Sequence, residues 1–204
     1  MNPPSKNKAL AVFLKNKILG QVKTRLAKDV GSEKALEIYS QLCTHTLNVA
    51  KAVNAEIHGF YTNKKKAHST FDKVHLQNGS DLGEKMKNAF ALLLEKHERV
   101  VLIGSDLPEL STALIEKAYD LLEENDVVLG PAIDGGYYLI GLRSVQPHLF
   151  EKMSYSHPEV LAQTLKRAKE LKLSVAMLEP LRDLDTLEDL KHFIYLIDWG
   201  PSTP

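Results

Sequence analysis

Short apolar runs alternate along the chain with longer segments in which apolar residues recur every three or four positions. The short runs predict strands at Ala9–Leu14, Glu56–Tyr61, Lys73–Gln77, Arg99–Ile103, Val127–Leu129 and Ser174–Leu178. The three- and four-residue spacing predicts helices at Ser32–Val53, Glu84–Lys96, Ala113–Asn125, Glu159–Leu171 and Leu187–Ile197. Because predicted strands and helices alternate along the chain, we expect one α/β domain over residues 1–204, with its core at about 9–197 and short flexible tails. Its sheet should be Rossmann-like, mixed and mostly parallel, with helices on both faces.

Polar residues stand before several of the predicted helices and suit the N-cap position, where a side-chain oxygen accepts a backbone N–H. Ser32 is the candidate cap after Gly31, and Thr186 is the candidate cap of the last helix. Ser111 and Thr112 serve the helix that begins near residue 113. Asp81 suits the same role, and the alternative is that it helps to shape a nucleotide pocket.

The composition is that of an ordinary globular protein, with 44% hydrophobic and 25% charged residues, so a substantial core can form. Lysines plus arginines equal aspartates plus glutamates, at 26 each, which argues against nucleic acid or a membrane surface as a partner. The one cysteine, Cys43, excludes an intrachain disulfide and fits a buried helix position. We find no signal-peptide pattern and no stretch of membrane-spanning length, so we expect a cytoplasmic protein.

A cationic loop follows the first predicted strand, where Lys15, Lys23 and Arg25 surround Gly20. In open α/β sheets, ligands bind beyond the carboxyl ends of the strands. Arginine can hold two phosphate oxygens at once and lysine adds a point charge, so this loop suits a phosphate or diphosphate. It is neither a Walker loop nor a GxGxxG fingerprint. A solvated basic loop without a ligand is the alternative interpretation.

Carboxylates follow two of the later strands. Asp106 comes directly after Arg99–Ile103, where its oxygens suit Mg²⁺ or Mn²⁺, and the alternative is a turn cap before Pro108. Asp134 precedes a Gly-Gly pair inside Val127–Leu142, which reads VVLGPAIDGGYYLIGL. Glycines let the backbone approach a ligand closely, but Asp-Gly-Gly is also a common hairpin turn. The cationic loop and these carboxylates together favour the site over the turn.

Five motifs carry a resemblance to a known family: LK…GQVKTRL, QNGSDLGEKM, IGSDLP, GPAIDGGYYLIGL and DLDT. Their order and spacing over about residues 9–190 resemble a largely uncharacterised bacterial family that is usually assigned as glycosyltransferases. That family has the GT-A, nucleotide-diphospho-sugar transferase fold, and some members are associated with arsenosugar biosynthesis. The chain is also similar to the guanylyltransferases that make molybdenum cofactor dinucleotide and the deazaflavin cofactor precursor.

The resemblance implies a seven-stranded mixed sheet with a nucleotide held over the loop after the first strand. The implied nucleotide- and phosphate-binding residues are Lys15, Lys23, Arg25, Asp81 and Ser105. The implied metal residues are Asp106 and Asp185. The implied donor and acceptor pocket is Asp134, Gly135, Gly136 and Tyr137, and the candidate catalytic residues are Asp134, Lys23 and Arg25.

Two departures from the family pattern concern the loops. The family often has Ala-Pro or Thr-Pro where this chain has residues 16–19, and a Trp-x-Thr pattern where this chain has Tyr155-Ser156-His157. The second departure concerns the acceptor side more than the nucleotide side. His157 by itself is typical of a surface or capping residue.

We therefore predict a metal-dependent glycosyltransferase that takes a nucleotide-diphospho-sugar donor and a small-molecule acceptor, with Mg²⁺ or Mn²⁺ as cofactor. The alternative is a guanylyltransferase-like nucleotidyltransferase that joins an NTP to a phosphorylated acceptor and releases pyrophosphate. Against it, the first loop carries only Gly20, whereas triphosphate-binding enzymes of this fold usually have a glycine-rich loop. A non-catalytic nucleotide-binding protein fits less well, because clustered anions are costly without a cation. The sequence does not identify the base, the sugar, the acceptor or the oligomeric state.

Overall fold

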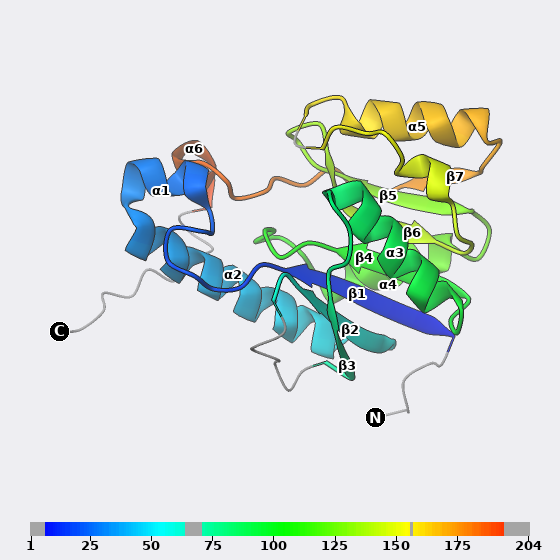
Figure 1. Ribbon diagram of the computed structural model, residues 1–204, viewed down its shortest axis with the longest axis horizontal. Helices are drawn as coiled ribbons and strands as arrows, with labels where there is room; N and C mark the ends of the chain where they lie inside the picture. Colours follow the sequence, from blue (N-terminus) through cyan, green and yellow to red (C-terminus); the bar gives the residue numbers. More distant parts are fainter. Residues whose placement is uncertain (1–6, 64–70, 156, 194–204) are drawn as a thin grey trace.

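The computed structural model describes residues 7–63, 71–155 and 157–193, and its described strands form one seven-stranded sheet in the order β3-β2-β1-β4-β6-β5-β7 (Figure 1). The strands are β1 (Lys8–Leu14), β2 (Glu56–Tyr61), β3 (Lys73–Leu76), β4 (Arg99–Ile103), β5 (Val127–Pro131), β6 (Tyr137–Leu142) and β7 (Val175–Met177). Only β6 runs antiparallel to its neighbours, β4 and β5, among these pairs. The predicted mixed, mostly parallel sheet is confirmed.

The described helices are α1 (Thr24–Val30), α2 (Ser32–Lys51), α3 (Leu82–Leu94), α4 (Thr112–Leu121), α5 (Val160–Glu170) and α6 (Leu187–His192), with a 3₁₀ turn at Pro147–Leu149. The sequence predicts a loop over the segment of α1. This helix has two turns and a single buried residue, Leu26, so it carries no apolar periodicity to detect. The predicted continuation of α6 to Ile197 and both predicted tails lie outside the described residues.

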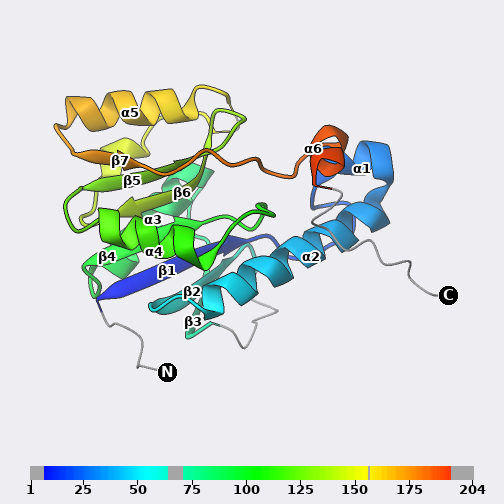
Figure 2. The ribbon, with the colours of Figure 1, turned by 180° about the vertical axis from the view of Figure 1, so that it is seen from behind.

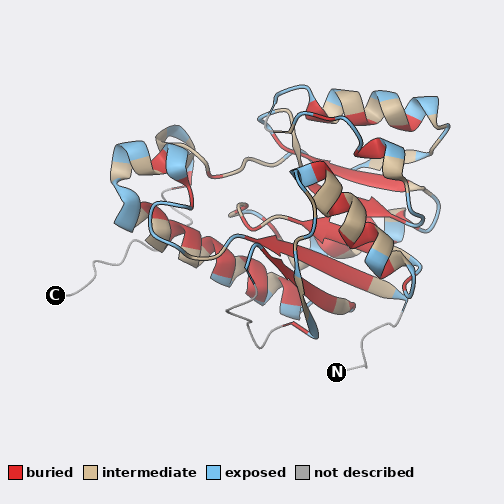
Figure 3. Cartoon of the chain, in the orientation of Figure 1, coloured by how far each residue is buried: buried red, intermediate tan, exposed pale blue. Residues whose placement is uncertain are grey.

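Helices cover both faces of the sheet, as predicted (Figure 2). On one face Tyr39 of α2 and Tyr119 of α4 pack against Leu10 and Val12 of β1. On the other face α3 and α5 pack over the alternate residues of the strands, and Figure 3 shows the central strands as buried. A third cluster joins α1 and α6 to the far end of α2 and includes Leu26. The loops that carry the predicted site residues lie between this end and the sheet (Figure 1).

The predicted N-caps are confirmed at three helices. Asp81, Ser111 and Thr186 each accept the backbone N–H three residues later, and Thr186 forms a capping box with Asp189. The prediction for Ser32 is wrong, because Gly31 holds that position with φ of 84° and Ser32 is the first helical residue. No described helix combines the length and the apolar character needed to cross a membrane.

Candidate functional site

A cavity of about 550 Å³ lies at the carboxyl ends of β1 and β4. Six predicted site residues line it: Lys15, Lys23, Arg25, Asp106, Asp134 and Asp185. A second cavity of about 460 Å³ shares four of these residues and adds the predicted residues Ser105, Gly136 and Tyr137. The chain therefore brings together cations and carboxylates that lie up to 170 positions apart, because parallel strands all deliver their following loops to one edge of the sheet.

Lys23 is the centre of the charged cluster. Its Nζ atom lies 3.0 Å from Oδ2 of Asp106 and 2.8 Å from Oδ1 of Asp185. The lysine side chain is only 3% exposed, whereas each carboxylate is 39% exposed. Burial alone lowers the pKa of Lys23, but the attraction of the two aspartates outweighs it and raises that pKa. The ammonium therefore stays charged and holds the two carboxylates together.

The backbone of Lys23 is left-handed, with φ of 47° and ψ of 44°. Such a conformation costs roughly 1 kcal/mol for a residue other than glycine. It places the side chain inward at the start of α1, while the neighbouring Arg25 stays exposed at the cavity. Lys23 and Arg25 therefore both line the cavity, the first from a buried position and the second from an exposed one.

Asp106 and Asp185 are held by their own loops. The backbone N–H of Leu184 donates to the carbonyl of Asp106 at 3.1 Å, which joins the loop after β7 to the loop after β4. Asp185 donates its backbone N–H to Asp189 of the α6 capping box at 3.1 Å. Burial by itself would raise the pKa of Asp106. The charge and the hydrogen bond of Lys23 act against burial, and the pKa is lowered overall, so this carboxylate is ionised.

Asp183 is a fourth carboxylate at the site, and the sequence motifs predict no role for it. It lines the second cavity, and its Oδ1 atom is buried without a hydrogen-bond partner among the described residues. Burial first, and then the charges of Asp106 and Asp134, raise its pKa to about 7. Strand-like alternation places Asp183 and Asp185 on one side of their segment and buries Leu184 on the other, and this period-two pattern was the available signal.

Tyr39 fixes the loop that carries Lys15. Its hydroxyl accepts the backbone N–H of Lys15 at 2.8 Å and lies 3.1 Å from the carbonyl of the same residue. The hydroxyl also lies 3.3 Å from Oγ of Ser105. Burial raises the pKa of Tyr39, so the phenol is protonated. No pattern in the sequence indicated the contacts made by this buried hydroxyl.

The Asp-Gly-Gly stretch is both a hairpin turn and a wall of the cavity. It connects the antiparallel strands β5 and β6, and Oδ1 of Asp134 accepts the N–H of Gly136 at 2.9 Å. Gly135 has φ of 92°, and a Cβ there would lie 2.0 Å from the carbonyl oxygen of Pro158. The carbonyl of Gly135 accepts the N–H of Leu161 in the first turn of α5 at 3.0 Å. The turn is therefore fixed against the start of α5, and His157, which precedes this helix, lines the cavity.

The remaining predicted residues lie around this centre. Asp81 caps α3 and is not among the residues that line the two cavities, so its predicted role in nucleotide binding has no support from geometry. The hydroxyl of Tyr137 is buried, and burial first, then Tyr155, raises its pKa. Nδ1 of His157 accepts the N–H of Glu159, the residue at the N-cap position of α5, at 3.3 Å.

The donor set at this site suits a divalent metal. Asp106 and Asp185 each place an oxygen within 3.0 Å of one point, which the Lys23 ammonium occupies, and Asp183 adds a buried oxygen without a partner. Carboxylate oxygens are the ligands that Mg²⁺ and Mn²⁺ prefer. The residues present therefore fit a hard divalent cation, for which Lys23 is a competitor.

Comparison with known proteins places the fold in context. Residues 41–157, more than half of the chain, match the family described as "Uncharacterized protein conserved in bacteria (DUF2064)". A solved structure from Desulfovibrio desulfuricans G20, described as a "putative nucleotide-diphospho-sugar transferase", is similar with a TM-score of 0.87 and 31% identity, over 97% of this chain and 90% of that one. A search of proteins with curated descriptions finds no match.

More distant solved structures share the fold alone. Rv0371c from Mycobacterium tuberculosis H37Rv has a TM-score of 0.59 and 16% identity, over 93% of this chain and 98% of that one, and its complex with manganese is also solved. The 4-diphosphocytidyl-2C-methyl-D-erythritol synthase of Anaerococcus prevotii DSM 20548 has a TM-score of 0.59 and 11% identity, over 94% and 98%. The chain belongs to the bacterial DUF2064 family and has the nucleotide-diphospho-sugar transferase fold.

Proposed function

We propose that this protein is a metal-dependent glycosyltransferase that uses a nucleotide-diphospho-sugar donor. The observation that carries the proposal is the division of charge around one cavity. Lys15, Lys23 and Arg25 line it from the loop after β1 and the start of α1, whereas Asp134 lines it from the β5–β6 turn. A nucleotide sugar has the same division, with an anionic diphosphate at one end and a hydroxyl-rich sugar at the other.

The cations supply the main catalytic effect. When the bond from the sugar to the diphosphate breaks, negative charge grows on the departing phosphate oxygen. Fixed positive groups that face this oxygen stabilise the transition state more than the ground state, and such preorganised electrostatics commonly provide the largest share of rate acceleration. Arg25 is exposed at the cavity and can contact two phosphate oxygens, while Lys15 adds a second charge.

Asp134 serves the sugar and acceptor side. Its Oδ1 atom is engaged by the N–H of Gly136, which fixes the carboxylate and leaves Oδ2 for a hydroxyl group. It acts as the base that takes the proton of the acceptor hydroxyl, or as a ligand of a sugar hydroxyl. Both roles need a carboxylate within hydrogen-bond reach of the substrate.

A divalent metal belongs at Asp106 and Asp185, with Asp183 beside them. Mg²⁺ or Mn²⁺ held there would neutralise part of the diphosphate charge. The similar protein from Desulfovibrio desulfuricans G20 supports the donor class through its description, and the manganese complex of Rv0371c supports a metal in this fold.

Nucleotidyl transfer is the second candidate function. It is favoured by the convergence of Lys15, Lys23 and Arg25 on one cavity, since three cations can also hold a triphosphate. Here a phosphorylated acceptor would attack the α-phosphate and pyrophosphate would leave, with charge neutralisation again providing most of the rate. Several solved structures of the same fold are described as cytidylyltransferases or as complexed with CTP.

The experiment measures binding first and turnover second. The purified full chain is heated with UDP-, GDP- and dTDP-sugars and with NTPs, each with and without Mn²⁺. A donor at a hundredfold excess over its Kd raises the Tm by about 5–10 °C. ³¹P NMR then identifies the product, which is a nucleoside diphosphate for glycosyl transfer and pyrophosphate for nucleotidyl transfer. If a nucleotide binds but neither product forms in the presence of acceptors, both transferase functions are excluded and the protein only binds nucleotides.

Two variants test the metal assignment. Asp106→Asn removes one charged ligand and should abolish the Mn²⁺-dependent part of the shift in Tm. Asp120→Asn changes an exposed carboxylate of α4 and is the matched control. A Mn²⁺-dependent shift that survives in the Asp106 variant contradicts the placement of the metal.

A further inference from the structure

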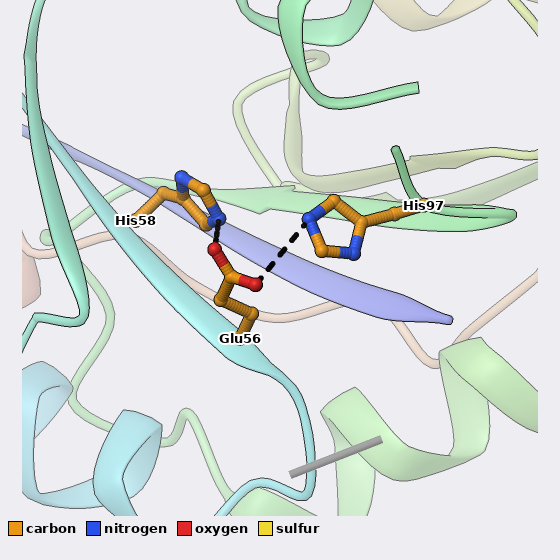
Figure 4. Close-up of side chains that lie close together, drawn as sticks. All are labelled: Glu56, His58 and His97. Atoms are coloured by element: carbon orange, nitrogen blue, oxygen red, sulfur yellow. Dashed lines mark ion pairs between the residues drawn. The ribbon is translucent and has the colours of Figure 1, made fainter. Parts of the chain in front are cut away.

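A cluster of side chains of the types that can bind a metal lies at the opposite end of the sheet from the candidate site. Glu56 and His58 lie on β2, and His97 lies just before β4 (Figure 4). The register pairs Glu56 with Ala9, at the start of β1, whereas the candidate site begins after Leu14 at its end. Five residues of strand separate these levels, or roughly 17 Å. The two clusters are therefore independent.

The sequence of β1 makes the contact possible. Glu56 and His58 lie beside Ala9 and Ala11 on the same face of the sheet. Because alanine has the smallest side chain that still packs, the longer side chains from β2 can meet His97 across β1. Bulkier residues at these two positions would fill this space.

The distances suit a shared metal ion. Nε2 of His58 lies 3.1 Å from Oε1 of Glu56, and Nε2 of His97 lies 3.8 Å from Oε2. All three ligand atoms lie within 4.8 Å of one another. Ligands about 2.0–2.1 Å from a tetrahedral zinc ion lie about 3.4 Å apart. A small inward movement of His97 therefore brings the three atoms to coordination distance.

His58 has a buried ring nitrogen that faces a carboxylate but makes no hydrogen bond within the described part of the chain. The residue is 2% exposed, and its Nε2 is buried without a hydrogen bond among the described residues, although Oε1 of Glu56 is near. Its Nδ1 lies 2.9 Å from Nε2 of His75 on β3. In one tautomer of His58, Nε2 carries the proton and faces the carboxylate. In the tautomer in which His58 donates through Nδ1, its Nε2 lone pair faces Oε1 of Glu56, and a cation between these two atoms removes the repulsion. Metal-bound histidines commonly bond a second group through the other ring nitrogen in this way.

We propose that Glu56, His58 and His97 form a binding site for a divalent transition metal, and that Zn²⁺ fits it best. Two imidazoles and one carboxylate match zinc and disfavour Mg²⁺ and Ca²⁺, which prefer oxygen ligands alone. β2 and the α3–β4 connection lie on opposite sides of β1, and the ion would link the two. Its role is to stabilise this edge of the sheet.

Lys73 is the competitor at this site. Its ammonium pairs with Oε1 of Glu56, the oxygen that faces His58. Lys73 is 50% exposed, so it can turn to water at small cost when a metal binds. The partly exposed Glu56 gives the ion a path from solvent.

Metal binding by the full chain tests the proposal. After treatment with a chelator, the protein is titrated with Zn²⁺ at pH 7.5 against a chromophoric competitor, and with Co²⁺ by visible absorption. We expect one tight site whose Co²⁺ spectrum has the intense bands of a tetrahedral ion. His97→Asn should weaken Zn²⁺ binding at least tenfold, whereas His148→Asn, at an exposed histidine outside the cluster, should not change it. Asp106→Asn should also leave this site unchanged, which separates it from the proposed catalytic metal.

Lys73→Met gives a second test that keeps all three ligands. If a metal competes with this ammonium for Glu56, the variant should bind Zn²⁺ more tightly by several fold. The proposal is overturned if the wild type binds no Zn²⁺, or if bound Zn²⁺ responds to neither His97→Asn nor Lys73→Met. In either case, the cluster is an ion-pair network among Lys73, Glu56 and the histidines.

Discussion

The ammonium nitrogen of Lys23 lies 2.8 Å from Oδ1 of Asp185, although 162 positions separate the two residues in the chain. The same ammonium contacts Asp106, so one buried cation closes the loops after β1, β4 and β7 around the cavity. The Lys23 ammonium links these loops, and it also competes with a divalent metal for the two carboxylates. The two roles lead to different predictions for one substitution.

Lys23→Met should destabilise the fold by about 2–3 kcal/mol. Removing one partner of a buried ion pair usually costs more, but both carboxylates remain 39% exposed and keep water contacts. Urea unfolding followed by circular dichroism measures the loss. Lys28→Met, at an exposed lysine of α1, is the control and should change stability by less than about 0.5 kcal/mol.

The same Lys23→Met variant should bind Mn²⁺ about tenfold more tightly than the wild type, because it removes a positive charge from the point where the two carboxylates converge. Under the proposed function it should lose transfer activity at the same time, since the cation would no longer face the phosphates. Calorimetric titration with Mn²⁺ at 0.15 M salt gives the affinity. Unchanged or weaker Mn²⁺ binding would show that the metal does not share oxygens with Lys23.

Tyr39→Phe should release the Lys15 loop. The variant loses the hydroxyl that accepts the Lys15 N–H, at a cost of about 1–2 kcal/mol, and should weaken binding of the nucleotide ligand. Tyr119→Phe is the control, because its hydroxyl also donates a buried hydrogen bond, to Ala9, but lies away from the cavity. Both variants should lose stability in urea, and only the first should lose ligand-induced stabilisation. Equal ligand binding by both would exclude a positioning role for Tyr39.

Gly135→Ala should be far more disruptive than Gly136→Ala. At Gly135 the φ of 92° and the 2.0 Å approach to Pro158 leave no space for a methyl group, so we expect a loss of about 2–4 kcal/mol. At Gly136 a Cβ meets only Oδ1 of Asp134, at 3.2 Å, and the loss should be below about 1 kcal/mol. The free energies of unfolding in urea decide this. Equal losses of stability would mean that the backbone at Pro158 moves to make room for the added methyl group.

Asp126→Asn should show a pH-dependent effect on stability. Asp126 accepts the N–H and the hydroxyl of Ser174, and these hydrogen bonds lower its pKa in the folded state. Because the pKa of Asp126 is lower in the folded state, its ionised carboxylate stabilises the fold at pH values above the unfolded pKa of about 3.9. This stabilisation is lost as the pH falls through the folded pKa. The wild type should exceed the variant by about 1 kcal/mol at pH 7, and the difference should shrink below pH 4. Urea unfolding at pH 7, 4.5 and 3 tests this, with Asp120→Asn as the control.

The sequence predicted the sheet well because strands such as Arg99–Ile103 are short, apolar and bounded by polar turns. It predicted which charged residues meet, because each follows a strand and parallel strands share one edge. It did not predict the helix at Thr24–Val30, whose two turns bury one side chain. It also missed the role of Asp183, since the raised pKa of that carboxyl depends on packing by residues far away in the chain.

The link between Lys23 and Asp185 also bears on how the protein is made. A ribosome that adds about 5–20 residues per second needs roughly 10–30 s to travel the 162 positions between them. During this interval the nascent chain already contains the lysine but lacks Asp185, and in the first part of it Asp106 is also missing. Burial of that ammonium is unfavourable until the second carboxylate emerges. The candidate pocket is therefore among the last parts of the chain to assemble, and an incompletely synthesised chain lacks a finished pocket.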